Sequence, residues 1–189
     1  MSDFRFPTRV QKLRERLAQD NLDALFISNT ENRRYISGFE SSAGYLLVTR
    51  HNAVICTDFR YIEQASQQAP GWRVDRIGGK PDWLANLVKE LEIKVLGFEA
   101  DDMTVETLDR FRKNLKQNDA NPKLKPTSSI CVELRAYKDD VELPLLQRAI
   151  DIGDQAFEET VAQLKVDMSE KEAAWIFEKA VRERGAESI

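Results

Sequence analysis

The sequence predicts a three-layer α/β domain on a mixed sheet, followed by a tail of two helices. Short apolar runs alternate with segments of helical periodicity through residues 1–136, a pattern typical of strands covered by helices. Two of the runs, 44–49 and 52–57, are separated only by Arg50-His51, so we expect them to form a hairpin. One antiparallel hairpin among strands that are joined by helices makes the sheet mixed.

The pattern changes after about Tyr137, where apolar residues continue at helical spacing without strand-like runs. We therefore expect residues 1–136 to form the α/β domain and residues 137–189 to form a linker and two long helices. Pro144 lies near the start of the first of these helices, where its missing N–H does least harm.

The first helix and the first strand follow from local signals. Thr8 is expected to open the helix, because its hydroxyl can cap the backbone and Gln11 can complete a capping box. Residues 22–27 are an almost continuous apolar run, which predicts a buried strand.

Two short helices are expected on either side of the hairpin. Ser28 or Thr30 would cap the first, which ends at Gly38 because glycine adopts the left-handed conformation at little cost. Thr57 or Asp58 would open the second.

The remaining elements of the α/β domain follow from apolar patterning. Strands are expected at 72–77 and 94–98, and the proline-containing segment 121–129 suits a sheet edge. Helices are expected after the loop 78–81 and after Thr104, which can cap the second of them. The inward face of that second helix is expected to carry Val105, Leu108, Phe111 and Leu115.

The two tail helices carry more apolar surface than they can leave in water. Ser169 and Glu172 are expected to form a capping box at the second helix, which ends at Gly185. The apolar faces include Leu146, Ile150, Phe157, Val161, Ile176, Phe177 and Val181. Large apolar patches mark association surfaces, so we expect the helices to pack on each other and on a second copy of the chain. The alternative is that they fold back onto their own α/β domain.

Composition argues against several function classes. The formal net charge of −4 disfavours general nucleic-acid binding, and no apolar run is long enough to span a membrane. The N-terminus lacks the basic flank and apolar stretch of a signal peptide. Cys56 and Cys131 are isolated and without metal-site spacing, which is typical of reduced thiols. We therefore expect a cytoplasmic protein that binds neither nucleic acid nor membrane.

Three patterns in order resemble the N-terminal domain of the creatinase, prolidase and aminopeptidase P metallopeptidases. The first consists of Asn32 and the run Tyr-Ile-Ser-Gly-Phe at 35–39, and the second spans 57–65 around Asp-Phe-Arg-Tyr. The third comprises Leu134, Arg135, Lys138, Glu142, Leu143, Arg148 and Ala149. The resemblance covers the whole chain and implies a ribonuclease H-like motif in the first domain.

The resemblance implies a proline-specific parent peptidase that uses two divalent metals, such as Mn, Co or Zn. In the family, the ligands are two Asp, one His and two Glu, and all lie downstream of the helices at 137–189, the first two of a pita-bread catalytic domain. None maps onto this chain, so we expect it to hold no catalytic or metal-ligating residue and to be inactive alone. Its implied partners are its own missing catalytic domain, a second copy in a homodimer and, in the parent, short proline-containing peptides.

The candidate site residues also come from the resemblance. In the family, the loop after the Gly-Phe pattern reaches toward a neighbouring subunit's active site, and the region after the hairpin lies near the subunit contact. The candidates for substrate shaping or subunit contact are Phe39, Glu40, Ser41, Ser42, Asp58, Arg60 and Tyr61. Alternatively, Phe39 is a core residue, Asp58 is a helix cap and Arg60 forms a surface ion pair.

Other polar residues have plainer interpretations. His51 is expected to be a hairpin-turn residue rather than a metal ligand. The acidic segment 99–102 is expected to be a solvated loop before the next helix, with metal binding as the alternative. Arg135 and Lys138 are either part of the family's domain junction or a solvated linker.

Two rival functions remain open from the sequence. A creatinase-type amidinohydrolase shares the fold, but that branch places an aromatic residue and an arginine in the loop, whereas Phe39 is followed here by Glu-Ser-Ser-Ala at 40–43. A non-enzymatic peptide- or protein-interaction module is the second rival. The sequence beyond Ile189 would discriminate, because only a peptidase needs the complete ligand set.

Overall fold

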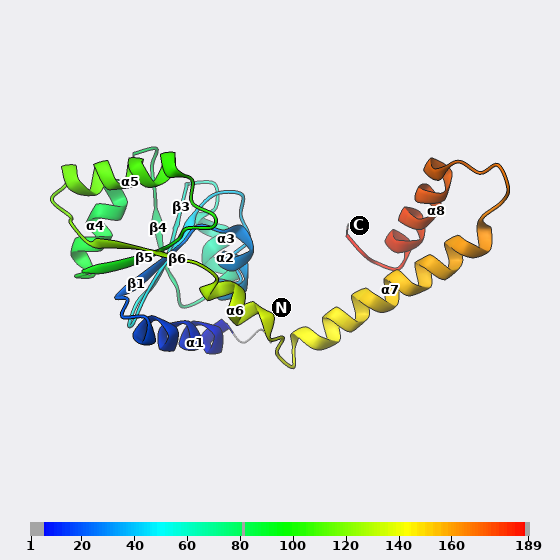
Figure 1. Ribbon diagram of the computed structural model, residues 1–189, viewed down its shortest axis with the longest axis horizontal. Coiled ribbons are helices and arrows are strands. Elements are labelled where there is room, and N and C mark those ends of the chain that lie inside the picture. The colour runs from blue at the N-terminus through cyan, green and yellow to red at the C-terminus, as the bar shows by residue number, and fades with distance from the viewer. Residues whose placement is uncertain (1–5, 81, 188–189) are drawn as a thin grey trace. The chain divides into compact units, whose positions relative to one another are not determined.

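The computed structural model describes residues 6–80 and 82–187. The chain divides into two compact units, residues 1–137 and 138–189. The first is a sheet with helices on both faces, and the second is a pair of helices (Figure 1).

The first unit contains a six-stranded mixed sheet with the strand order β4-β3-β2-β1-β5-β6. The strands are β1 Ala24–Ile27, β2 Tyr45–Thr49, β3 Ala53–Thr57, β4 Arg73–Arg76, β5 Val95–Glu99 and β6 Lys123–Thr127. Strand β2 is antiparallel to both β1 and β3, and the other neighbours pair in parallel. The predicted hairpin and mixed sheet are confirmed. Because only β2 is reversed, the other five strands end at the same edge of the sheet.

Helices cover both faces of this sheet, which confirms the three-layer architecture. In the first unit they are α1 Phe6–Gln19, α2 Thr30–Ser37, α3 Ile62–Gln68, α4 Asp82–Glu90, α5 Val105–Gln117 and α6 Ile130–Ala136. Alternate residues of a strand point to opposite faces. In β1, Leu25 and Ile27 pack with α1, α2, α3 and α6, whereas Ala24 and Phe26 pack with α4 and α5.

The starts of three helices differ from the expectations. Helix α1 already includes Phe6, so Thr8 lies inside it and is not its cap. The cap of α2 is Asn29, whose side chain accepts a hydrogen bond from the backbone N–H of Asn32. Helix α3 follows Tyr61 and has no side-chain cap, so neither Thr57 nor Asp58 opens it.

The predicted end of α2 is confirmed. Gly38 has a φ of 77° and its N–H donates to the carbonyl of Arg34. A Cβ built on Gly38 would lie 2.7 Å from two ring carbons of Phe6. Glycine is therefore needed both for its backbone conformation and for the close approach of α1.

The expectations for helix α5 and for the edge strand are confirmed except at Val105. Thr104 caps α5, and Phe111 and Leu115 face the core. Val105, however, is 76% exposed, because it is the first residue of α5 and lies beyond the helix's inward face. Strand β6, which contains Pro126, pairs in parallel with β5 and is the outer strand. The sequence patterns missed α6, a single short helix of seven residues.

The second unit consists of α7 Glu142–Gln163 and α8 Glu170–Glu183. The predicted capping box between Ser169 and Glu172 is present. The helices pack on each other through a small cluster of Ala156, Ala180 and Val181 with Ile152, Phe177 and Ala186 against it. The apolar side chains of α7 that remain exposed are Leu143, Leu145, Leu146, Ile150, Phe157 and Val161. Packing of the two helices on each other is as expected, and their packing on a second copy stays a prediction.

Candidate functional site at the carboxyl edge of the sheet

A cleft of about 1060 Å³ lies along the edge where the parallel strands of the first unit end. Its walls include Ser28 after β1, Asp58 after β3, Ile77 after β4 and Asp102 after β5, together with Tyr45 at the start of the reversed strand β2. Ligands of open α/β sheets bind outside the carboxyl ends of the strands. This edge of the sheet is therefore the candidate functional site.

The loop after α2 reaches the cleft from a buried anchor. Phe39 is 1% exposed and belongs to the core under α1 and α2, where its ring meets that of Tyr61 edge to face at 6.4 Å. Phe39 therefore anchors the loop in the core. Of the two interpretations of Phe39, that of a core residue describes its position. Glu40 is exposed and is tied to α3, because Gln64 Nε2 donates to its carbonyl at 2.6 Å and its N–H donates to Gln68 Oε1 at 3.0 Å.

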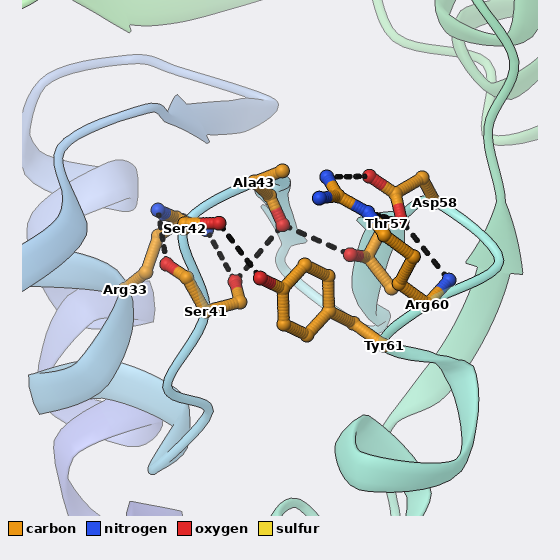
Figure 2. A network of polar contacts seen from close by, with 8 residues as sticks. All are labelled: Arg33, Ser41, Ser42, Ala43, Thr57, Asp58, Arg60 and Tyr61. Atoms are coloured by element: carbon orange, nitrogen blue, oxygen red, sulfur yellow. Dashed lines mark hydrogen bonds and ion pairs between the residues drawn. The ribbon is translucent and has the colours of Figure 1, made fainter.

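Hydrogen bonds to the loop fix the shape of residues 41–43 (Figure 2). Arg33 donates from Nη1 to the hydroxyl of Ser41 at 3.0 Å and from Nη2 to its carbonyl at 3.2 Å. The Ser41 hydroxyl and the Thr57 hydroxyl each donate to the carbonyl of Ala43 at 2.9 Å. These bonds connect the loop to α2 and to the end of β3.

Two of the candidates present polar atoms outward from this framework. Ser42 is exposed, and its hydroxyl lies 2.7 Å from that of Tyr61 in a hydrogen bond that either can donate (Figure 2). Tyr61 is half-buried, with its ring against Phe39. The loop after α2 and the segment after β3 therefore meet through these two hydroxyls.

Asp58 and Arg60 form a local ion pair at the end of β3 (Figure 2). Asp58 Oδ1 accepts from the Arg60 N–H and from its Nε, both at 3.0 Å, and Oδ2 accepts from Nη2 at 2.7 Å. The side-chain hydrogen bond from Arg60 lowers the pKa of Asp58, and the same bond raises the pKa of Arg60. Asp58 is thus kept ionised, and both of its carboxylate oxygens are hydrogen-bonded to Arg60. A carboxylate in this state suits ligand binding better than proton transfer.

Arg33 is a buried residue of this site that the sequence patterns did not single out. It is 3% exposed, and in the described residues no carboxylate forms an ion pair with it and its Nε has no hydrogen-bond partner. Desolvation lowers the pKa of its guanidinium. The available signal was its spacing, because Arg33 lies three residues before Ile36 on the inward face of α2.

Glu99 contradicts the expectation of a solvated acidic loop. It is 5% exposed, and its carboxylate accepts from the N–H groups of Ser28 and Asn29, each at 2.8 Å, and from Asn32 Nδ2 at 2.7 Å. Burial raises its pKa although these hydrogen bonds oppose the rise. Asp101 and Asp102 are exposed, as expected.

The other polar residues lie apart from the loop. His51 is exposed in the hairpin turn. Arg135 Nη1 donates to Asn32 Oδ1 at 2.9 Å, so Arg135 joins α6 to α2 and is not a solvated linker residue, whereas Lys138 is exposed.

Among residues 6–80 and 82–187, no group of three or more His, Cys, Asp or Glu is placed to hold a metal ion. None of the helices in these residues has the length and hydropathy of a membrane-spanning segment.

Part of the cleft lining is aromatic. The rings of Tyr45 and Trp83 stack with centroids 5.6 Å apart, and Phe111 meets both edge to face at 5.8 Å. Arg110 lies over Phe111 and Arg76 lies over Phe59, each at 5.8 Å from the ring centroid. The cleft therefore combines flat apolar surface with guanidinium groups.

Comparison with known proteins shows which family the first unit belongs to. Residues 9–137 match the model of the creatinase/prolidase N-terminal domain. The uncharacterized peptidase YqhT of Bacillus subtilis is 33% identical over 181 residues, which are 95% of this chain and 50% of that protein. The chain thus spans about half the length of this relative.

Two solved structures show the same architecture. The Xaa-Pro dipeptidase from Bacillus anthracis superposes with a TM-score of 0.90 at 33% identity, over 97% of this chain and 50% of that one. The N-terminal domain of the cytoplasmic peptidase PepQ from Mycobacterium tuberculosis superposes with a TM-score of 0.63 at 38% identity, over 68% of this chain and 98% of that one. By its sequence and its fold, the chain belongs to the creatinase/prolidase N-terminal domain family.

Proposed function

We propose that this chain is the N-terminal, non-catalytic part of a proline-specific metallopeptidase, either an Xaa-Pro aminopeptidase or an Xaa-Pro dipeptidase. The observation that carries the proposal is the match of nearly the whole chain to one half of an Xaa-Pro dipeptidase at a TM-score of 0.90. The described residues offer no cluster of metal ligands. From the family resemblance, we infer that the two divalent ions of the parent, Mn, Co or Zn, are bound in the half that this chain does not match.

The contribution of this chain to the reaction is to shape the pocket for short peptides. The outward surface of the loop at 40–42, together with the segment at 58–61, supplies hydroxyls, an ion pair and the exposed ring of Phe59. Because Arg33 and Thr57 hold the loop from behind, its shape is set before a substrate arrives. Pre-organised loops on rigid elements bind with less ordering cost than flexible ones.

The same proposal places the parent in the cytoplasm as a homodimer. The cytoplasmic location is supported by the relative named a cytoplasmic peptidase. Association of the 189-residue chain with a second copy is supported by apolar side chains of α7 that stay exposed, with Phe157 at 62% and Val161 at 49%; in the parent, these helices would belong to the catalytic domain. Clustered apolar exposure of this kind marks an interaction surface.

A chimera tests the proposed function. The chain would be joined to the half of the Bacillus anthracis Xaa-Pro dipeptidase that it does not match, and hydrolysis of an Xaa-Pro dipeptide would be measured with Mn, Co and Zn. We expect activity from the chimera and none from the 189-residue chain alone. Turnover by the chain alone would contradict the non-catalytic role. A folded, metal-loaded chimera without activity would favour the interaction module instead.

A further inference from the structure

The cleft at the carboxyl edge holds more positive than negative charge, although the chain as a whole is acidic. The chain has a formal net charge of −4. The cleft is lined by four arginines and two aspartates. Concentrated charge of one sign in a concave surface raises the local concentration of ions of the opposite sign. The cleft is thus the place on the first unit where an anion would gather.

The local pairing of these groups leaves three of the arginines without an ion pair among the described residues. Asp58 is bound by Arg60. Asp102 accepts from the Ser28 hydroxyl at 2.5 Å. Arg33, Arg76 and Arg110 form no ion pair with any residue of the described part of the chain.

Arg33 makes the strongest case for a ligand. A cation that is 3% exposed normally forms a direct ion pair, because an unpaired buried charge costs several kcal/mol. The carboxylates of Asp102, Glu99 and Glu31 act on Arg33 electrostatically, but none of them forms an ion pair with it in the described part of the chain. Arg33 is hydrogen-bonded only to neutral oxygens of Thr30 and Ser41, and its buried Nε has no partner among the described residues. Because this Nε is itself buried, a ligand in the cleft would interact with Arg33 through its charge and not through a hydrogen bond to that atom.

Arg76 and Arg110 keep donors available on the rim of the cleft. Each guanidinium lies over an aromatic ring, which orients it without using its N–H groups. Neither guanidinium donates a hydrogen bond to another described residue. Guanidinium groups bind carboxylate and phosphate oxygens with two parallel hydrogen bonds, so these two suit an oxyanion.

We propose that the cleft at the carboxyl edge binds a small organic oxyanion, a carboxylate or a phosphate, in the field of Arg33, with Arg76 and Arg110 as its direct donors. The stacked rings of Tyr45 and Trp83 provide an apolar wall for the rest of the molecule. This site does not depend on the proposed peptidase role, because every group that forms it belongs to this chain.

The test uses the 189-residue chain and three probes at constant ionic strength: inorganic phosphate, benzoate and, as the uncharged match to benzoate, benzamide. Binding is followed by NMR through the backbone amides of Gly78 and Gly79, which line the cleft, and through the Nε–H signal of Arg33. We expect saturable shifts with phosphate or benzoate and none with benzamide. Tighter binding of phosphate identifies a phosphate ester as the natural class of ligand, and tighter binding of benzoate identifies a carboxylate.

A pair of variants on one helix tests the assignment of the donors. Arg110→Gln removes a cleft guanidinium, whereas Arg112→Gln removes an arginine of α5 that pairs with Asp109 and does not line the cleft. We expect Arg110→Gln to weaken binding by about fivefold or more and Arg112→Gln to leave it unchanged. Equal weakening by both variants, or no saturable shift with either anion, would overturn the proposal.

Discussion

The guanidinium of Arg33 donates to both oxygens of Ser41, to its hydroxyl at 3.0 Å and to its carbonyl at 3.2 Å. One buried side chain of α2 therefore sets the position of the loop that faces the cleft. The position of Arg33 on α2 thus determines the shape of the loop at the candidate site.

Removing the Ser41 hydroxyl should destabilise the first unit. Ser41→Ala leaves an N–H of the buried Arg33 unpaired and deletes the bond to the Ala43 carbonyl, which costs about 1–3 kcal/mol. Urea denaturation measures the change in the free energy of unfolding. Ser66→Ala, an exposed change on α3, is the control and should stay within about 0.5 kcal/mol of the wild type. Equal stability of the two variants would show that the hydrogen bonds of the Ser41 hydroxyl do not stabilise the loop.

Gly38 should tolerate no side chain. Its φ of 77° is strained for other residues, and a Cβ would lie 2.7 Å from the ring of Phe6. Gly38→Val should therefore lower the free energy of unfolding by about 1 kcal/mol or more. Gly79→Ala is the control, because no atom lies within 4 Å of the new Cβ and Gly79 lacks a positive φ. A Gly38→Val protein as stable as the control would show that α1 and α2 can separate freely there.

How much the sequence could predict depends on the range of the interactions. The hairpin, the glycine end of α2 and the proline-containing edge strand were predicted, because each follows from neighbouring residues. The short helix α6 was missed, because seven residues give too little periodicity. The cap of α2 was assigned one residue away from Asn29, within the usual uncertainty of helix boundaries.

The burial of Glu99 could not be read from local pattern, and that of Arg33 was signalled only by its spacing to Ile36 on α2. Glu99 was expected in solvent, but it meets the backbone of Ser28, which is 71 residues away in the sequence. Arg33 follows another polar residue and looks like a surface group until α2 is placed on the sheet. The candidate loop itself was found by resemblance, whereas its support by Arg33 needed the structure.

Glu99 should make stability depend on pH in a defined direction. Burial raises its pKa above the ordinary value of 4.5, so the folded state binds its proton more tightly than the unfolded state does. Its contribution to stability is then fully present below 4.5 and is lost as pH rises through the folded pKa. We expect the wild type to lose stability relative to Glu99→Gln over that window and the difference to level off above it. A difference that is independent of pH from about 4 to 8 would contradict the raised pKa.

The exposed face of α7 should mediate self-association. Burying a Phe side chain is worth about 1.5–3 kcal/mol, and Phe157 is 62% exposed. We expect light scattering to give the mass of a dimer for the wild type and of a monomer for Phe157→Ser. Gln155→Ser, an exposed polar change on the same helix, should remain dimeric. A monomeric wild type would remove the support for the homodimer.

We have proposed that the loop at 40–42 helps to select short proline-containing peptides, and a change at the exposed Ser42 should alter that selection. In the chimera with the Bacillus anthracis catalytic half, Ser42→Trp would add bulk at an exposed loop position without touching the buried bonds of Arg33. The measurement is kcat/KM for an Xaa-Pro dipeptide and for a longer Xaa-Pro peptide, with Ser66→Trp on the exposed side of α3 as the control. The account predicts that Ser42→Trp changes the ratio of the two values by about tenfold or more, which is a difference of about 1.4 kcal/mol in transition-state binding, while the control leaves it unchanged. An unchanged ratio in a folded, active Ser42→Trp chimera would contradict the claim.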